Sequence, residues 1–193
     1  MTFDPALIND LIHSRRSVFP DQFTDQVIPD AIVEQILENA HRAPTHKKTE
    51  PWRFFVFAGT AREQLAQAQA EIYKTHTPAE KFSEKTYQKL LQKPLKASHI
   101  IAIAMQRDPR ERVPEIEEIE AVACAVQNIY LSATAYGLGG YWGSGGITYY
   151  AAAKEYFGLG EKDRLLGFFY LGYPASLPEA SPRSPISEKV TWV

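Results

Sequence analysis

Apolar residues along this chain recur at two different spacings, which predict an ordered series of helices and strands. Helical spacing, with apolar positions three and four residues apart, runs through residues 4–14, 29–41 and 115–136. The sequence Thr-Ala-Arg-Glu at residues 60–63 is typical of a capping box and predicts a helix that continues to about Tyr73. The pattern therefore predicts helices distributed along most of the chain.

Continuous apolar runs between these helices predict buried strands. They occupy residues 52–57, 98–105 and 161–173 and are too short for core helices. Residues 75–96 are polar and lysine-rich, which indicates surface helix and loop. The Pro-, Ser- and Glu-rich tail has a composition that fits disorder, yet it ends in Val190–Val193, which is apolar enough to add a strand.

Length and composition limit the class of protein. With 193 residues and 45% hydrophobic content, we expect residues 1–193 to form a single domain. The net charge of −2 gives no overall basic field for nucleic-acid binding. The sequence also shows no signal-peptide pattern and no run long enough to span a bilayer, so a cytoplasmic protein is expected. Cys124 is the only cysteine, and its apolar helical surroundings predict inert packing.

Two basic segments carry candidate chemistry. Residues 14–17 read Ser-Arg-Arg-Ser, and paired guanidinium groups beside a hydroxyl suit a phosphate or another anion. Residues 42–49 form a loop of basic and hydroxyl side chains directly before an aromatic run. From the residues alone, a solvated helix end and an ordinary charged loop are the favoured explanations of these segments.

A third segment, residues 137–146, is rich in glycine around Tyr141 and Trp142. Glycine permits positive φ and close approach of a backbone to a ligand, and Gly137 suits a helix C-cap. The segment lacks the preceding strand and following long helix of a dinucleotide-binding fingerprint. As a bare glycine-rich turn it is a weak signal.

Other enzyme classes lack their residues. The sequence contains no HExxH, paired CxxC, P-loop or GxSxG motif, so zinc hydrolases, phosphoryl-transfer enzymes and serine esterases are not indicated. His41 and His46 are five residues apart, not the four expected of two zinc ligands on one helix. No metal site and no catalytic acid or base is therefore nominated.

Residues 43–56 resemble a known family. They read A-P-T-H-K-K-T-E-P-W-R-F-F-V, similar to the loop and strand beside FMN in nitroreductases and, within that family, to the small YdjA-like subgroup. Further similarities extend over most of the chain. The resemblance implies an α+β nitroreductase-like fold with a central mixed or mainly antiparallel sheet flanked by helices. It also implies an intertwined homodimer that binds FMN at the subunit interface.

The resemblance also implies cofactor-binding roles for individual residues. The family's R-(R/H)-S motif binds the phosphate, ribityl chain and pyrimidine edge of FMN, and its G-L-G-(G/S)-x-W segment leads into backbone that faces the flavin. An arginine and a histidine reach the FMN bound mainly by the other subunit, and an arginine in the tail meets the phosphate. The matching residues here are Arg15, Arg16, Ser17, Trp142, Gly143, Ser144, Arg42, His46 and Arg183.

Two positions depart from the family pattern. Phe19 stands where many members have a basic residue, so one polar contact to the flavin ring must be missing or supplied elsewhere. Gly143 stands where some YdjA-like sequences have arginine, which leaves room but removes a charge.

In this family, variable segments such as residues 75–96 border the substrate site.

The implied activity is NAD(P)H-dependent reduction of small electron-poor acceptors, such as nitroaromatics or quinones, by a ping-pong transfer of hydride through FMN. Alternatives are dehalogenation or flavin fragmentation on the same fold, or a flavin-binding sensor or partner module without turnover. The sequence leaves the physiological acceptor and the choice between NADH and NADPH open.

Overall fold

The structure is a computed structural model and describes residues 2–193. A four-stranded antiparallel sheet with strand order β1-β2-β4-β3 lies at its centre. The strands are β1 (Trp52–Ala58), β2 (His99–Met105), β3 (Gly139–Gly143) and β4 (Arg164–Gly172). With the helices described below, this confirms the α+β class and the antiparallel sheet.

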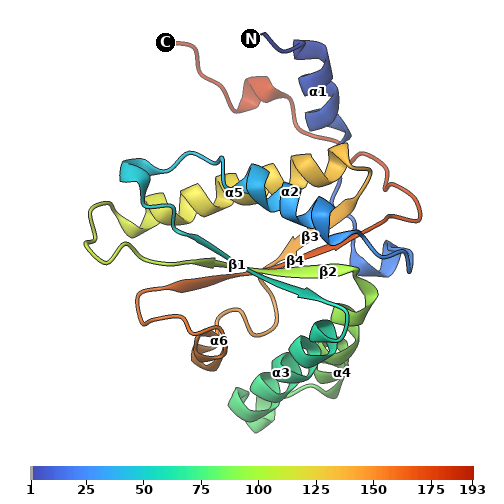
Figure 1. Cartoon of the computed structure of the whole chain (residues 1–193), viewed down its shortest axis with the longest axis vertical. Coiled ribbons are helices and arrows are strands. Elements are labelled where there is room, and N and C mark those ends of the chain that lie inside the picture. The colour runs from blue at the N-terminus through green and yellow to red at the C-terminus, as the bar shows by residue number, and fades with distance from the viewer. Residues whose placement is uncertain (1) are drawn as a thin grey trace.

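Helices cover both faces of this sheet (Figure 1). One face carries α2 (Asp30–Ala40) and the long helix α5 (Glu115–Ala135). The opposite face carries α3 (Ala61–His76), α4 (Glu84–Gln92) and α6 (Ala151–Tyr156). No helix between residues 2 and 193 has the length and apolarity needed for a membrane span.

The central strand β2 divides the core into two layers. Ile101 and Ile103 pack into the cluster with α2 and α5, whereas Ile100 and Ala102 pack into the cluster on the other face. All residues of β2 are buried, because both faces of the strand are covered. This arrangement explains the continuous apolar run that predicts a buried strand.

Helix α1 (Pro5–Ser14) and the C-terminal tail both extend away from the sheet (Figure 1). No side chain of α1 is buried, and Phe3, Leu7 and Trp192 are exposed. The tail contains a short 3₁₀ helix at Ile186–Glu188 and no strand, so the expected strand at its end is absent from the sheet of this chain.

Two strand predictions need correction. Residues 52–57 were expected to be largely buried, but in β1 only Trp52 is, because β1 is an edge strand. Conversely, β3 lies within the glycine-rich segment, where strand propensity is low and the sequence indicates only a turn. Tertiary pairing with β4 is what makes this segment a strand.

Three details of the helices differ from the prediction or extend it. Thr60 has helical dihedral angles and makes no side-chain cap, so the expected capping box does not form, and α3 continues to His76. Cys124 is exposed, because it lies on the face of α5 that points away from the sheet. Gly137 ends α5 as expected, with φ of 70°.

The prediction from this packing concerns Gly140 in β3. A Cβ atom there would lie 2.4 Å from Cζ of Phe169, whose side chain is fully buried. Gly140→Ala should lower the free energy of unfolding by about 1–3 kcal/mol through overpacking, measured by urea denaturation. Gly145→Ala is the control, because its Cβ would meet nothing within 4 Å. Equal stability of the two variants would contradict this close packing.

Candidate functional site

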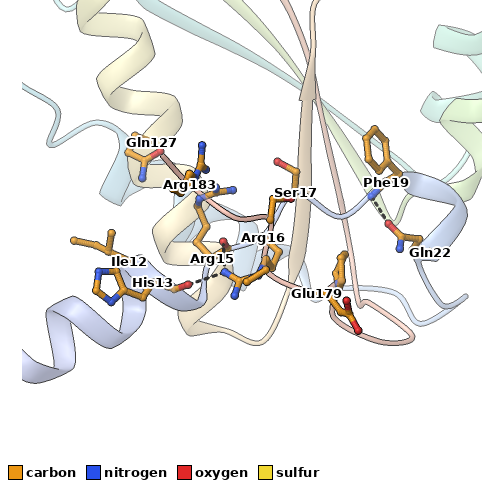
Figure 2. Close-up of a pocket in the computed structure, with 13 residues that line it drawn as sticks. Ile12, His13, Arg15, Arg16, Ser17, Phe19, Gln22, Gln127, Glu179 and Arg183 are labelled. Atoms are coloured by element: carbon orange, nitrogen blue, oxygen red, sulfur yellow. Dashed lines mark hydrogen bonds between the residues drawn. The ribbon is translucent and has the colours of Figure 1, made fainter. Parts of the chain in front are cut away.

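A cavity of about 830 Å³ lies where the end of α1, the side of α5 and the C-terminal tail meet (Figure 2). Its lining includes Arg15, Arg16, Ser17 and Arg183, which come from opposite ends of the chain. The structure thus brings together four of the residues that the sequence nominates for cofactor binding.

The Arg15–Ser17 segment is held in place by β3. Ser17 forms a parallel bridge with Gly140, and the backbone N–H of Val18 donates a hydrogen bond to the Gly140 carbonyl at 3.0 Å. The guanidinium of Arg15 lies 5.0 Å from the ring centroid of Tyr130 on α5, within cation–π range. Backbone pairing and ring contact together orient the paired arginines toward the cavity.

Positive charge in this cavity is not neutralised by ion pairs. Within residues 2–193, Arg15, Arg16 and Arg183 form no salt bridge. Arg16 Nη1 instead donates to backbone carbonyls, including His13 at 2.6 Å (Figure 2). Glu179 is the acidic residue in the lining. Three arginines with one carboxylate leave a net positive site, which suits a phosphate group.

The end of β3 is anchored to neighbouring elements. The backbone N–H of Trp142 donates to the Tyr130 hydroxyl at 2.7 Å, and its indole N–H donates to the Leu166 carbonyl at 3.1 Å. Gly167, with φ of 120°, allows close approach: a Cβ there would lie 2.4 Å from the Gly143 carbonyl oxygen. The backbone after Trp142 is therefore positioned by β4 and by α5.

Two further cavities lie beside β3 on its α4 side. The outer one, of about 420 Å³, and the inner one, of about 260 Å³, share Lys89, Lys93 and Tyr141 in their linings. Phe19 lines both the outer cavity and the arginine cavity, and its ring centroid lies 4.5 Å from that of Tyr141. Gly143 lines the inner cavity. The three cavities therefore adjoin around Phe19 and Tyr141.

Lys93 is a functional candidate that sequence reasoning missed. Its ammonium lies 4.7 Å and 4.2 Å from the ring centroids of Tyr141 and Tyr170. The pKa of Lys93 is lowered to about 8, mainly by burial and also by the nearby charge of Lys89, while Asp21 opposes this shift. The only sequence signal for this lysine was its place in the lysine-rich segment that borders the substrate site in relatives.

Arg42 and His46 lie elsewhere in this chain. Arg42 is 73% exposed at the end of α2 and forms an ion pair with Glu38. His46 Nδ1 lies 2.5 Å from Glu117 Oε2, in a separate cavity that also includes Cys124. One chain therefore does not bring these two residues to the arginine cavity.

The loop that carries His46 has an unusual backbone. Lys47, Lys48 and Glu50 all have positive φ, a conformation that is costly for residues with side chains. The Lys47 ammonium donates to the Arg112 carbonyl at 2.9 Å, which ties this loop to the segment before α5. Such strain is common where a binding loop must hold one shape.

Comparison with known proteins agrees with this geometry. The sequence model of the nitroreductase family matches residues 12–173. The chain belongs to the nitroreductase family. It is 31% identical over 187 residues to a Bacillus subtilis protein named "Putative NAD(P)H nitroreductase YfhC", covering 96% of this chain and 94% of that relative.

Solved structures of the family share the fold. The nitroreductase-like family protein from Bacillus cereus is 31% identical, with a TM-score of 0.83 over 100% of this chain and 98% of the other. A nitroreductase-like structure from Desulfovibrio desulfuricans, solved in complex with FMN, is 27% identical, with a TM-score of 0.71 and coverage of 100% and 98%.

The prediction from this site is a pH-dependent stability that Lys93 controls. The folded pKa of about 8 lies below the ordinary value of 10.5, so the unfolded chain binds the proton more tightly between these values. As pH rises from 7 to 10.5, the free energy of unfolding of the wild type should increase by about 1–3 kcal/mol relative to that of Lys93→Met, measured by urea unfolding. Lys85→Met is the control, because it removes an exposed amine of α4. The stability difference between the wild type and Lys85→Met should change less with pH. A wild-type advantage that stays constant with pH would contradict the lowered pKa.

Proposed function

We propose that residues 1–193 form one FMN-binding domain that works as a homodimeric NAD(P)H oxidoreductase and reduces small electron-poor acceptors. The observation that carries this proposal is the arginine cavity beside β3, whose three guanidinium groups form no salt bridge in the part of the chain that the structure describes. It is supported by the FMN in the structure from Desulfovibrio desulfuricans and by the NAD(P)H in the name of YfhC.

The residues present fit FMN in chemistry and arrangement. Arg15, Arg16 and Arg183 supply charge-assisted donors for a phosphate, and Ser17 supplies a hydroxyl for a polyol chain. The cavity of about 830 Å³ is large enough for a cofactor of this size. At Phe19 this cavity adjoins the cavities beside Tyr141. There the backbone of Gly143 and Ser144 would face the flat ring system of the cofactor.

The chemistry requires little from protein side chains. FMN, when bound, supplies the redox step by accepting hydride from NAD(P)H and passing it to the acceptor. The protein holds the ring, leaves one of its faces accessible and stabilises negative charge through its arginines. No general acid or base is assigned. The proposed kinetic scheme is ping-pong, in which donor and acceptor occupy the same open face in turn.

A second copy of this chain would complete the site. Arg42 and His46 do not reach the arginine cavity of their own chain, although the family motif pairs both with FMN. Helix α1 and the tail carry exposed apolar side chains, including Leu7 and Trp192. Burial of these side chains against a partner would be favourable, and the family resemblance implies that the partner's loop reaches the cofactor.

The first experiment tests cofactor and activity together. Purified protein is incubated with FMN, desalted, and examined by visible absorption before and after anaerobic addition of NADH or NADPH. Retained flavin that bleaches with either nucleotide supports the proposal and identifies the donor. A colourless protein contradicts FMN binding, whereas a flavin-loaded dimer that neither nucleotide reduces favours a sensor without turnover.

The kinetic scheme has its own test. Initial rates measured at several acceptor concentrations should give parallel double-reciprocal lines against NAD(P)H. Intersecting lines would show that donor and acceptor bind together and would rule out the ping-pong scheme.

Arg15→Ala should weaken FMN binding by about 10- to 100-fold, because a charged hydrogen bond contributes roughly 1.5–3 kcal/mol. The measurement is the quenching of FMN fluorescence on titration with apoprotein. Arg110→Ala is the matched control, since Arg110 is exposed and outside the lining of the arginine cavity. An unchanged FMN affinity in Arg15→Ala would contradict the assigned phosphate contact.

Arg42→Ala should weaken FMN binding without lowering stability, because its ion pair with Glu38 is exposed and such pairs contribute about 0–1 kcal/mol. FMN titration and thermal unfolding of the same samples separate the two effects. Glu38→Ala removes the same ion pair and should leave FMN affinity unchanged. If both variants weaken FMN equally, Arg42 acts through the ion pair instead of the cofactor.

A further inference from the structure

The loop before β1 is held in a conformation that its own residues disfavour. Lys47, Lys48 and Glu50 have φ of 50°, 53° and 44°, in the left-handed region that is costly for residues with a side chain. Hydrogen bonds inside the loop, such as that from the Glu50 N–H to Thr45 Oγ1 at 3.2 Å, are local. Strained backbone of this kind persists only where its surroundings determine it, so contacts from outside the loop must offset the strain.

Those contacts come from residues 106–114, which connect β2 to α5. The Lys47 ammonium donates to the Arg112 carbonyl at 2.9 Å, and Arg112 Nη1 donates back to the Lys47 carbonyl at 3.4 Å. The two residues are 65 positions apart in the chain, and their segments lie side by side at one end of the sheet (Figure 1). This reciprocal pair engages both the side chain and the carbonyl of Lys47, and so restricts its backbone.

Asp108 fixes the orientation of Arg112. Arg112 Nε and Nη2 donate to the two carboxylate oxygens of Asp108 at 2.7 Å and 3.2 Å, and the Arg112 backbone N–H donates to Asp108 Oδ2 at 3.1 Å. The pKa of Asp108 is lowered to about 2, mainly by the hydrogen bond from the Arg112 side chain, so this carboxylate is ionised at neutral pH. A planar, bidentate pair leaves the guanidinium one orientation, with Nη1 toward the loop.

Asp108 is in turn anchored to the start of α5. Its backbone N–H donates to Glu118 Oε1 at 3.0 Å, and Glu118 is 1% exposed. Arg107 forms an ion pair with Glu118 and donates to the Val113 carbonyl at 2.7 Å. A continuous series of hydrogen bonds therefore runs from a buried carboxylate of α5 to the loop. Moving the loop would break bonds in this series, which is unfavourable where the groups are buried.

The loop carries His46, and Arg112 lies outside the cavities assigned to the cofactor. His46 Nδ1 lies 2.5 Å from Glu117 Oε2 on α5, beside a separate cavity of about 640 Å³. Arg112 lines neither the arginine cavity nor the two cavities beside β3. An effect of Arg112 on cofactor binding would therefore have to act through the loop.

We propose that Arg112 is a positioning residue for the loop of residues 45–50. Through Asp108 and Lys47, it holds the loop in the shape that presents His46 to a second copy of this chain. The role of the loop at the partner's cofactor rests on the proposed function, whereas the dependence of the loop's shape on Arg112 does not. The two parts are therefore tested by separate measurements.

Hydrogen exchange, followed by mass spectrometry in the apoprotein and the FMN-loaded protein, tests the shape of the loop. The amides of residues 46–50 should exchange at least about 10-fold faster in Arg112→Ala than in the wild type, because the bonds that hold the loop are lost. Lys47→Met leaves Asp108 untouched and should act in the same direction. Arg110→Ala is the control, because it removes an exposed arginine of the same segment and should change exchange by less than about twofold. Thermal unfolding of each variant confirms that it is folded.

FMN affinity is the second measurement, made by fluorescence titration of the same proteins. Arg112→Ala should weaken FMN binding at least about fivefold, because a loop that is no longer ordered must be ordered again when the cofactor binds. Arg110→Ala should leave the affinity within about twofold.

Glycine at position 48 separates a positioning role from a general loss of stability. Lys48 is exposed, and glycine adopts its φ of 53° without strain. In the Arg112→Ala background, Lys48→Gly should recover at least about threefold of the lost FMN affinity and slow the exchange of the loop. Lys48→Ala removes the same side chain but keeps the Cβ atom, so it should recover neither.

Four outcomes decide between the two parts. Unchanged exchange in both Arg112→Ala and Lys47→Met would overturn the inference, and so would equal recovery by Lys48→Gly and Lys48→Ala. Faster exchange with unchanged FMN affinity would show that the loop does not serve the cofactor and would overturn the positioning role. If exchange rises in Arg112→Ala but the wild type binds no FMN, the control of the loop by Arg112 is supported and the proposed function fails.

Discussion

The pairing of β3 with β4 is the constraint on which the candidate site depends. It positions Gly140, whose carbonyl accepts the Val18 N–H and so fixes the arginines that precede it. The same pairing places Tyr141 and Gly143 at the walls of the cavities on the α4 side. The close contact of Gly140 with Phe169 leaves no room for a side chain, so packing requires glycine at this position.

Positive charge without internal partners is the second organising feature. The chain has a net charge of −2, and among its described residues the basic side chains Arg15, Arg16, Arg183, Lys89 and Lys93 form no ion pair. These five residues gather around adjoining cavities on either side of Phe19. Like charges repel, so an anion bound near them would be stabilised. The phosphate of a bound cofactor would supply such negative charge.

The departures of this chain from the family pattern become intelligible together. The resemblance implies that Phe19 stands where many members have a basic residue and Gly143 where some have arginine. In this chain Lys93 enters the same region from the segment after α4 and lies against Tyr141. A basic group is therefore present beside these two positions, although it comes from another element.

Local pattern determined much of this protein: the buried strand β2, the long helix α5 with its glycine end, and the motifs that indicate the nitroreductase family. These features follow from short-range periodicity and backbone preference, which neighbouring residues encode. The tertiary structure alone decided that the glycine-rich segment is a strand, that β1 is a half-exposed edge, and that Lys93 and Gln69 share a cavity. Those outcomes depend on contacts between residues far apart in the chain. At such positions the strand partner and the burial of the side chain, not local propensity, determine the backbone conformation and the pKa of an ionisable group.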